Sequence, residues 1–508
     1  MLFNSYVFLF GFLPVTLGVY YLLGRLPSPR PALTWLTSAS LFFYGWWDPP
    51  YLILLAASML FNFSVGVRLT RAARRAAPLR RPLLAFGIAG NLALIGYYKY
   101  AGFFAGSLEA LFGFDLGEQS VLLPLAISFY TFQQIAYLVD AARGQVEEYS
   151  LIDYCLFVAF FPQLIAGPIV HHHEVMPQFA QRATFRFSHD NFAVGLTFFT
   201  IGLFKKVVWA DTLGSFASPV FAAASEGAPI SALEAWTGVL AYTLQLYFDF
   251  SGYSDMAVGL ARMVGIELPY NFNSPYKAVN IIDFWRRWHM TLSRFLRDYL
   301  YIPLGGNRSG QGRRYLNLFL TMLLGGLWHG AGWTFVFWGA LHGLFLFVNH
   351  AWHAVRAALG FPVGGGTRWG RCLARLLTLL AVILGWVVFR AETMGAALNL
   401  LSAMGGSHGL VGLGPASVEP AAIAPFAGWP GGSEIVKRLL AADRLVFIAG
   451  LFAVAVFGPN SQEWIDRAGH RQPLVWHPNL LWASATAAML LFSVTQLSRV
   501  SEFLYFQF

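Results

Sequence analysis

The sequence contains few cysteines and few charged residues. Two cysteines among 508 residues, Cys155 and Cys372, allow at most one disulfide and show no metal-binding spacing. Charged residues make up 12% of the chain, whereas soluble domains carry about 25%. Hydrophobic residues make up 57% and aromatic residues 17%. These proportions exclude an ordinary soluble domain and predict an all-α integral membrane protein that crosses the bilayer many times.

The net charge of +9 is concentrated in a few loops. Such clusters are typical of cytoplasmic loops in membrane proteins rather than of a nucleic-acid surface. The largest cluster, six arginines within 68–81, precedes an apolar run and an acidic loop at 109–118. Counting apolar segments from this cluster predicts about 11–13 transmembrane or re-entrant helices, with both termini outside the cytoplasm. Because no internal repeat or separate soluble stretch is visible, we expect one membrane-embedded domain over 1–508, which contacts the lipid bilayer and binds no nucleic acid.

A basic, aromatic segment at 281–301 is the first candidate functional stretch. If it forms one helix, its arginines lie within about 100° of arc and its aromatic residues occupy the opposite side. His289 then lies at the margin of the apolar side, turned away from the arginines. Such a helix lies in the membrane interface, where its arginines anchor the protein or, in addition, receive the phosphates of an acyl donor. These candidate donor-binding residues are Arg286, Arg287, Arg294 and Arg297.

The segment at 315–348 is nearly all apolar and roughly 34 residues long, whereas one span needs about 20. Glycines interrupt it on both sides of Trp328 and His329. Backbone can break at membrane depth only where protein or a water-filled cavity satisfies its polar groups, and an ionisable residue at such a break is a functional candidate. We therefore predict a functional role for His329 and a structural role for His342. The interrupting glycines are Gly325, Gly326, Gly330 and Gly332.

Three smaller groups of polar residues can be interpreted in more than one way. Asp249 and Asp255 could supply acid or base chemistry, but we weigh more heavily a role in orienting neighbours or binding backbone amides. Three consecutive histidines at 171–173 cannot all face one metal ion from a helix, and no second ligand cluster is visible, so we predict a polar surface loop and no bound metal. Lys205 and Lys206 end an apolar run and are predicted to be a cytoplasmic flank.

Seven stretches resemble the membrane-bound O-acyltransferases, in particular the bacterial branch related to alginate O-acetylation. The resemblance implies a ring of tilted spans around a thinned core, with a funnel from each face meeting near the deep histidine. It implies that His329 is the catalytic histidine and that His289 occupies a second active-site position, supported by Trp328, Asp249 and Asp255. The matching stretches are 2–10, 127–140, 161–169, 247–257, 284–293 (Phe-Trp-Arg-Arg-Trp-His-Met-Thr-Leu-Ser), 326–330 (Gly-Leu-Trp-His-Gly) and 503–508.

The reaction implied by this resemblance is acyl transfer across the bacterial inner membrane. A cytoplasmic thioester, acetyl-CoA, is the expected donor, and no permanently bound cofactor is expected. Neutral His329 acts as a general base on an acceptor hydroxyl or carries the acetyl group itself, and burial favours the neutral form of histidine. His289 orients the reactants or stabilises developing charge.

The C-terminal stretch Phe-Leu-Tyr-Phe-Gln-Phe makes Tyr505 a candidate acyl relay by resemblance to related envelope acylation systems. The alternative is an aromatic anchor at the membrane interface. The leading hypothesis is an enzyme that supplies acetyl groups for an exopolysaccharide such as alginate, together with a periplasmic or membrane-anchored acetyltransferase partner. The alternatives are acetylation of peptidoglycan or another envelope glycan, D-alanyl transfer from a carrier protein, and a non-catalytic export scaffold.

Overall fold

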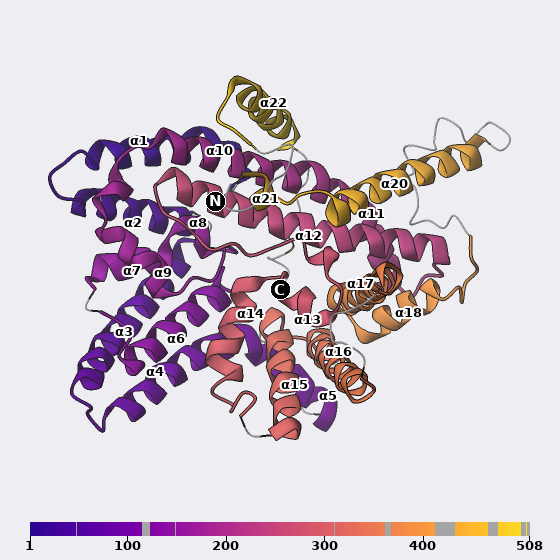
Figure 1. Ribbon diagram of the computed structural model, residues 1–508, viewed down its shortest axis with the longest axis horizontal. Coiled ribbons are helices and arrows are strands. Elements are labelled where there is room, and N and C mark those ends of the chain that lie inside the picture. The colour runs from indigo at the N-terminus through magenta and orange to yellow at the C-terminus, as the bar shows by residue number, and fades with distance from the viewer. Residues whose placement is uncertain are drawn as a thin grey trace. The chain divides into compact units, whose positions relative to one another are not determined.

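The structure is a computed structural model that describes residues 1–508 except 47, 114–121, 148, 309, 361–366, 412–431, 466–475, 499–503 and 505–508 (Figure 1). All regular elements within the described residues are helical, and none of these residues forms a strand. The all-α prediction is therefore confirmed. The chain divides into two compact units, and each unit is assembled from three separate stretches of sequence.

The first unit comprises Met1–Leu203, Gly252–Asn271 and Trp476–Ser498. Within it, α3 and α4 both pack on α6, while α2 packs on α1 and on α7 (Figure 1). Its elements are η1 (Phe8–Phe12), α1 (Leu13–Leu23), α2 (Arg30–Gly45), α3 (Pro49–Arg74), α4 (Arg80–Ile95), η2 (Gly96–Tyr100), α5 (Ala101–Phe112), α6 (Ile127–Arg143), α7 (Leu151–Ala159), α8 (Phe161–Leu164), α9 (His172–Val175), η3 (Met176–Ala180), η4 (Arg182–Phe185), α10 (His189–Phe204) and α22 (Leu480–Gln496).

The second unit comprises Phe204–Ser251, Phe272–Val475 and Arg499–Phe508. α12 (Ala232–Met263) contributes its first part to this unit and its last part to the first unit. The remaining elements are η5 (Lys205–Ala210), α11 (Asp211–Ser225), η6 (Pro275–Lys277), α13 (Ile281–Trp285), α14 (Met290–Leu296), η7 (Arg297–Tyr301), α15 (Gly310–His329), α16 (Trp333–Ala358), α17 (Arg368–Arg390), α18 (Met394–Met404), α20 (Gly432–Phe457) and α21 (Ser461–Ile465).

Four helical stretches in the described part of the chain are long and apolar enough to cross a membrane. They are Pro49–Arg74, His189–Ser225, Trp333–Ala358 and Arg368–Arg390. Three shorter apolar helices accompany them, at Phe8–Leu23, Met394–Met404 and Leu480–Gln496. A helix needs about 20 apolar residues to span the hydrocarbon core. The chain is therefore a multi-pass membrane protein, as its composition predicts.

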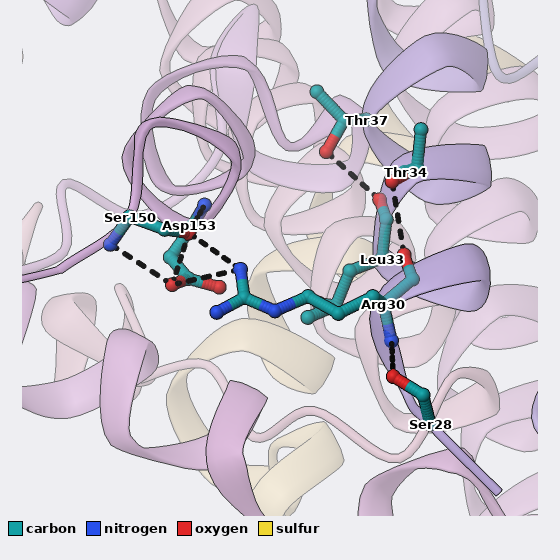
Figure 2. Close-up of polar contacts among 7 residues, drawn as sticks. All are labelled: Ser28, Arg30, Leu33, Thr34, Thr37, Ser150 and Asp153. Atoms are coloured by element: carbon teal, nitrogen blue, oxygen red, sulfur yellow. Dashed lines mark hydrogen bonds and ion pairs between the residues drawn. The ribbon is translucent and has the colours of Figure 1, made fainter.

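Side-chain hydrogen bonds lie at the starts of α2 and α7 in the first unit (Figure 2). Ser150 and Asp153 form a capping box at the start of α7, in which each side chain accepts a hydrogen bond from the other residue's backbone N–H. Arg30, the first residue of α2, donates from Nη1 to Ser150 Oγ at 2.8 Å and lies 3.8 Å from Asp153 Oδ2. This contact joins the beginnings of the two helices.

The long apolar segment forms a hairpin of α15 and α16. α15 continues through Gly325 and Gly326 and ends at His329, and the backbone leaves the helix at 330–332 before α16 begins. The predicted break beside His329 is therefore confirmed on its C-terminal side, whereas the prediction that Gly325 and Gly326 break the chain is wrong. Glycine at these two positions lies within a continuous helix, and at Gly326 it allows close packing of the hairpin.

Gly326→Ala is expected to destabilise the hairpin. A Cβ at this position would lie 2.3 Å from the carbonyl oxygen of Phe335 and 2.9 Å from the Cα of Gly339, and both are backbone atoms of α16. Overpacking of this kind costs about 1–3 kcal/mol. Gly325→Ala is the matched control, because its Cβ would meet only Leu296 Cδ1, at 3.2 Å. Thermal unfolding in detergent should show a lower Tm for the Gly326 variant alone, and equal Tm values for both variants would contradict this packing.

Candidate active site

The segment predicted to be one helix over 281–301 is interrupted at His289, so that prediction is wrong. α13 ends at Trp285, α14 begins at Met290, and His289 between them has φ 44° and ψ 54°. The helical hydrogen-bond ladder stops because the carbonyl oxygen of Arg287 accepts from the backbone N–H of Asn273 at 2.9 Å. A left-handed conformation costs a non-glycine residue about 1–2 kcal/mol, and such strain is found preferentially at functional sites.

This interruption turns the His289 side chain into the interior of the second unit, where it has no exposed surface. The edge of its ring meets Phe250 at 4.8 Å between centroids and 89° between planes. Trp328 lies 6.1 Å away, also edge-on. His289 is therefore a fully enclosed imidazole rather than a residue at the margin of an interfacial helix.

His329 is the last residue of α15, directly before the 330–332 break. Its ring is packed edge-to-face within a group of aromatic rings, with centroids 4.9 Å from Trp328, 5.3 Å from Trp338 and 5.3 Å from Phe389. Trp338 comes from α16 and Phe389 from α17, so three helices hold this imidazole. Rings in these arrangements prefer defined edge and face contacts, and they restrict the orientation of His329.

The structure brings His289 and His329 together, with ring centroids 6.3 Å apart. A ring nitrogen lies about 1.2 Å from its centroid and a hydrogen bond adds about 2.8 Å, so one oxygen atom can bridge two imidazoles whose centroids are within about 8 Å. His329 keeps 7% of its surface exposed, whereas His289 has none. Of the two imidazoles, only His329 therefore retains any exposed surface.

His342 is the third histidine of this region, and it occupies a different environment. It lies within α16 without exposed surface, against Trp338 at 4.7 Å and Trp285 at 5.2 Å between ring centroids. A Cβ on Gly385 of α17 would lie 2.9 Å from its Nε2 atom, so the neighbouring helix passes directly over the ring. The structural role of His342 stays a prediction.

A buried ion cluster in the same unit was missed by the sequence reasoning. Lys206 Nζ lies 2.7 Å from Asp211 Oδ1 and 2.7 Å from Asp249 Oδ1. The Lys206 and Asp249 side chains are only 2% and 1% exposed, and Lys205 is buried with its Nζ 2.7 Å from Ser461 Oγ. The prediction of a cytoplasmic flank at these lysines is wrong, because two carboxylates compensate the charge of Lys206 inside the protein.

The two aspartates expected to support the histidines have different surroundings. Asp249 faces Lys206 and also the backbone N–H of Leu504, which is buried in the hydrophobic core of the second unit. Asp255 is buried on the part of α12 that belongs to the first unit. Tyr505 lies outside the described residues. Leu504, which directly precedes Tyr505 in the chain, therefore lies beside the Lys206–Asp249 ion pair.

The four candidate donor-binding arginines do not lie on one continuous helix. Arg287 pairs with Asp283 at 2.8 Å and donates to the carbonyl oxygen of Asn273 at 3.3 Å. Arg297 makes two hydrogen bonds to Asp298, at 2.7 and 2.9 Å. Arg286 is exposed and Arg294 is half-buried. Carboxylate partners reduce the positive charge that Arg287 and Arg297 offer to a phosphate, and the role of all four in donor binding stays a prediction.

The site combines two imidazoles at an interrupted helix with an enclosure of aromatic rings. Imidazole side chains in such a position can transfer protons to and from a hydroxyl group. Residues 118–369 match the model of the membrane-bound O-acyltransferase family. The chain belongs to that family, in the branch of the alginate O-acetylases, and it is an acyltransferase.

Individual relatives support this assignment over most of the chain. The peptidoglycan O-acetyltransferase of Helicobacter pylori is 41% identical over 541 aligned residues, which cover 100% of this chain and 98% of that protein. The probable alginate O-acetylase AlgI of Pseudomonas aeruginosa is 46% identical over 80% of this chain and 75% of its own length. The teichoic acid D-alanyltransferase of Bacillus subtilis is more distant, with 28% identity over 53% of this chain. The chain is therefore an O-acetyltransferase of this family.

Proposed function

We propose that this enzyme takes acetyl groups from cytoplasmic acetyl-CoA and passes them across the bacterial inner membrane for O-acetylation of an exopolysaccharide such as alginate. The observation that carries the proposal is the pairing of His289 and His329, with ring centroids 6.3 Å apart at an interrupted helix end. The 46% identity to a probable alginate O-acetylase supports the choice of acceptor class. No permanently bound cofactor takes part.

In the proposed reaction, neutral His329 accepts the proton of an acceptor hydroxyl as its oxygen attacks the thioester carbonyl carbon. The new carbon–oxygen bond replaces the carbon–sulfur bond, and the leaving thiolate of CoA takes the proton back from the imidazolium. His289 holds the reacting oxygen or stabilises the developing charge from the second side. Transient acetylation of His329 is the alternative path.

Access from both faces is part of the proposal. The donor approaches from the cytoplasmic side, guided by Arg286 and by the other arginines of 281–301, and the acceptor approaches through an opposed funnel from the periplasm. Both chain termini lie on the periplasmic side in this topology. A periplasmic or membrane-anchored acetyltransferase partner would then carry the acetyl group to the glycan.

Peptidoglycan is the second candidate acceptor, and one specific observation favours it. The relative named for peptidoglycan O-acetylation aligns with 100% of this chain, whereas the alginate relative aligns with 80%. Any other envelope glycan with a free hydroxyl offers the same chemistry.

Vesicles of defined orientation test the proposal. Labelled acetyl-CoA is supplied only on the cytoplasmic face of proteoliposomes, and alginate oligomers or peptidoglycan fragments are supplied only on the opposite face together with extracts of the periplasm. We expect label on a glycan hydroxyl on the far side. Label that remains on the donor side, or transfer that requires a D-alanyl carrier protein instead of acetyl-CoA, would contradict the proposal, and the labelled glycan identifies the acceptor.

The relay role of Tyr505 is tested in the same assay. Tyr505→Phe removes the hydroxyl that would carry an acetyl ester and keeps the aromatic ring that would serve as a membrane anchor. We expect transfer to the glycan to fall at least about tenfold, while hydrolysis of acetyl-CoA continues. Undiminished glycan acetylation by the variant would rule the relay out, and mass spectrometry of the C-terminal peptide detects the ester directly.

A further inference from the structure

A cluster of possible metal ligands lies in the first unit. Asp140 comes from the last turn of α6, and His171 and His173 lie at the start of α9. One ligand atom from each of these three side chains lies within 4.8 Å of the other two. In the part of the chain that the structure describes, no other group of three His, Cys, Asp or Glu side chains meets this condition. Helix α6 thus supplies a carboxylate partner that the sequence pattern around the three histidines does not predict.

The backbone at the start of α9 separates the three histidines into two directions. His171 is extended, with φ −90° and ψ 150°, whereas His172 and His173 are helical. The rings of His171 and His173 lie side by side, with centroids 5.4 Å apart and planes at 30°. Two imidazoles on one tetrahedral zinc ion have centroids about 5 Å apart, because each nitrogen lies about 2.1 Å from the ion. The His172 ring is turned at 88° to that of His173.

His172 contacts the cluster without being one of its three candidate ligands. Its Nδ1 lies 3.3 Å from Asp140 Oδ2, and its Nε2 lies 3.1 Å from the carbonyl oxygen of Gln145. The contact with Asp140 is at ion-pair distance, and neighbouring groups of this kind orient ligating carboxylates in metal sites. Glu174 Oε2 accepts a hydrogen bond from the backbone N–H of His171 at 2.9 Å, which fixes the position of that residue. Two of the three candidate ligands are therefore held in place by neighbouring side chains.

Burial and charge indicate which ions suit the cluster. Asp140 and His171 are buried, whereas His173 is exposed, so an ion can enter from the protein surface beside His173. Arg143 Nη1 lies 3.6 Å from Asp140 Oδ1 and reduces the negative charge of the cluster. Hard cations such as Ca²⁺ need several oxygen ligands, whereas Zn²⁺ and similar ions bind well to imidazole.

We propose that Asp140, His171 and His173 form a binding site for a divalent ion that prefers imidazole ligands, with Zn²⁺ as the ion of best fit. Two histidines and one carboxylate leave a fourth position for water. The ion joins the end of α6 to the start of α9, and it stabilises this part of the first unit. The site is separate from the proposed acetyl transfer, and its test does not depend on that activity.

Metal analysis of the full-length protein tests the site. The protein is purified in detergent through a tag without histidine, stripped with chelator and titrated with Zn²⁺ against a chromophoric chelator. We expect one equivalent bound with a Kd of about 1 μM or tighter. Co²⁺ in its place should give the visible absorption bands of a four-coordinate ion. Absence of stoichiometric binding would show that the cluster is a hydrogen-bonded group only and would overturn the proposal.

His173→Ala is the decisive variant, because its exposed side chain can be removed without opening the core. We expect the affinity for Zn²⁺ to fall at least 100-fold and the Zn²⁺-dependent rise in Tm to disappear. Asp140→Asn should weaken binding in the same direction. His408→Ala, at an exposed position of the second unit, is the matched control and should bind as the unmodified protein does. Unchanged affinity of the His173 variant would place any bound zinc elsewhere and contradict the site.

Discussion

Replacing His329 with alanine is expected to lower the rate of acetyl transfer by about 10²- to 10⁴-fold, the usual contribution of a positioned general base. The protein should still fold and insert, because the aromatic rings around His329 also contact one another. Trp338 and Phe389, for example, lie 5.0 Å apart between centroids. The measurement is the initial rate of transfer from labelled acetyl-CoA in proteoliposomes containing equal amounts of folded protein.

Two control variants separate catalysis from packing. His342→Ala removes a histidine that is fully buried in α16 and packed among aromatic rings, so its Tm should fall while the rate per folded molecule is kept. His408→Ala, at the surface, should change neither quantity. Full transfer activity of the His329 variant would remove the basis of the proposed mechanism.

A double variant tests whether His289 and His329 act as one unit. If both hold the same reacting oxygen, His289→Ala combined with His329→Ala should be no slower than His329→Ala alone, because the effects of residues that act together are not additive. Independent roles would instead multiply the two losses. The comparison uses kcat and kcat/KM for the donor, since a role confined to binding would appear in KM.

Lys206→Met is expected to cause the largest loss of stability among single substitutions in the second unit. The lysine lies 2.7 Å from both Asp211 Oδ1 and Asp249 Oδ1, and its side chain is 2% exposed. Methionine fills a similar volume but removes the counter-charge that Lys206 provides to both carboxylates. Removing one partner of a buried ion pair costs about 3–5 kcal/mol. Thermal unfolding in detergent should show a Tm lower by about 5 °C or more.

Substitutions of the aspartate partner test whether the lost charge of Lys206 causes the fall in Tm. Asp249→Asn leaves Lys206 paired with Asp211, so its Tm should fall less than that of Lys206→Met. Combining Lys206→Met with Asp249→Asn should restore part of the loss, because only one carboxylate, Asp211, has then lost the charge of Lys206. A Lys206→Met variant as stable as the unmodified protein would mean that water enters and compensates this cluster.

The sequence alone was sufficient to predict the membrane character, the helical class and the position of His329. A single span cannot accommodate the apolar run that contains His329, and Gly330 and Gly332 mark the interruption. The geometry of His289 could not be predicted in this way. Its left-handed backbone depends on a hydrogen bond between Asn273 and Arg287, and a helical wheel treats the segment as continuous.

The charged residues and the proposed metal ligands illustrate the same limit: a local sequence pattern does not show which distant residue lies beside them. A lysine pair at the end of an apolar run is typical of a membrane flank, and only the approach of Asp249 from α12 shows that Lys206 is buried. The prediction of a surface loop at 171–173 is wrong for His171 and His172, which are buried, and their carboxylate neighbour, Asp140, lies on a different helix. In both cases the deciding partner is distant in sequence, and hydrophobic periodicity carries no information about it.

Two indole rings contact His329, and their fluorescence can report whether the imidazole is protonated. Trp328 and Trp338 have centroids 4.9 and 5.3 Å from the imidazole, and a protonated imidazole at such a distance quenches indole fluorescence by electron transfer. If His329 accepts a proton during turnover as proposed, emission from these indoles should dim at that step and recover when the proton leaves. Stopped-flow recordings on the unlabelled enzyme could follow the proton in this way without any attached dye.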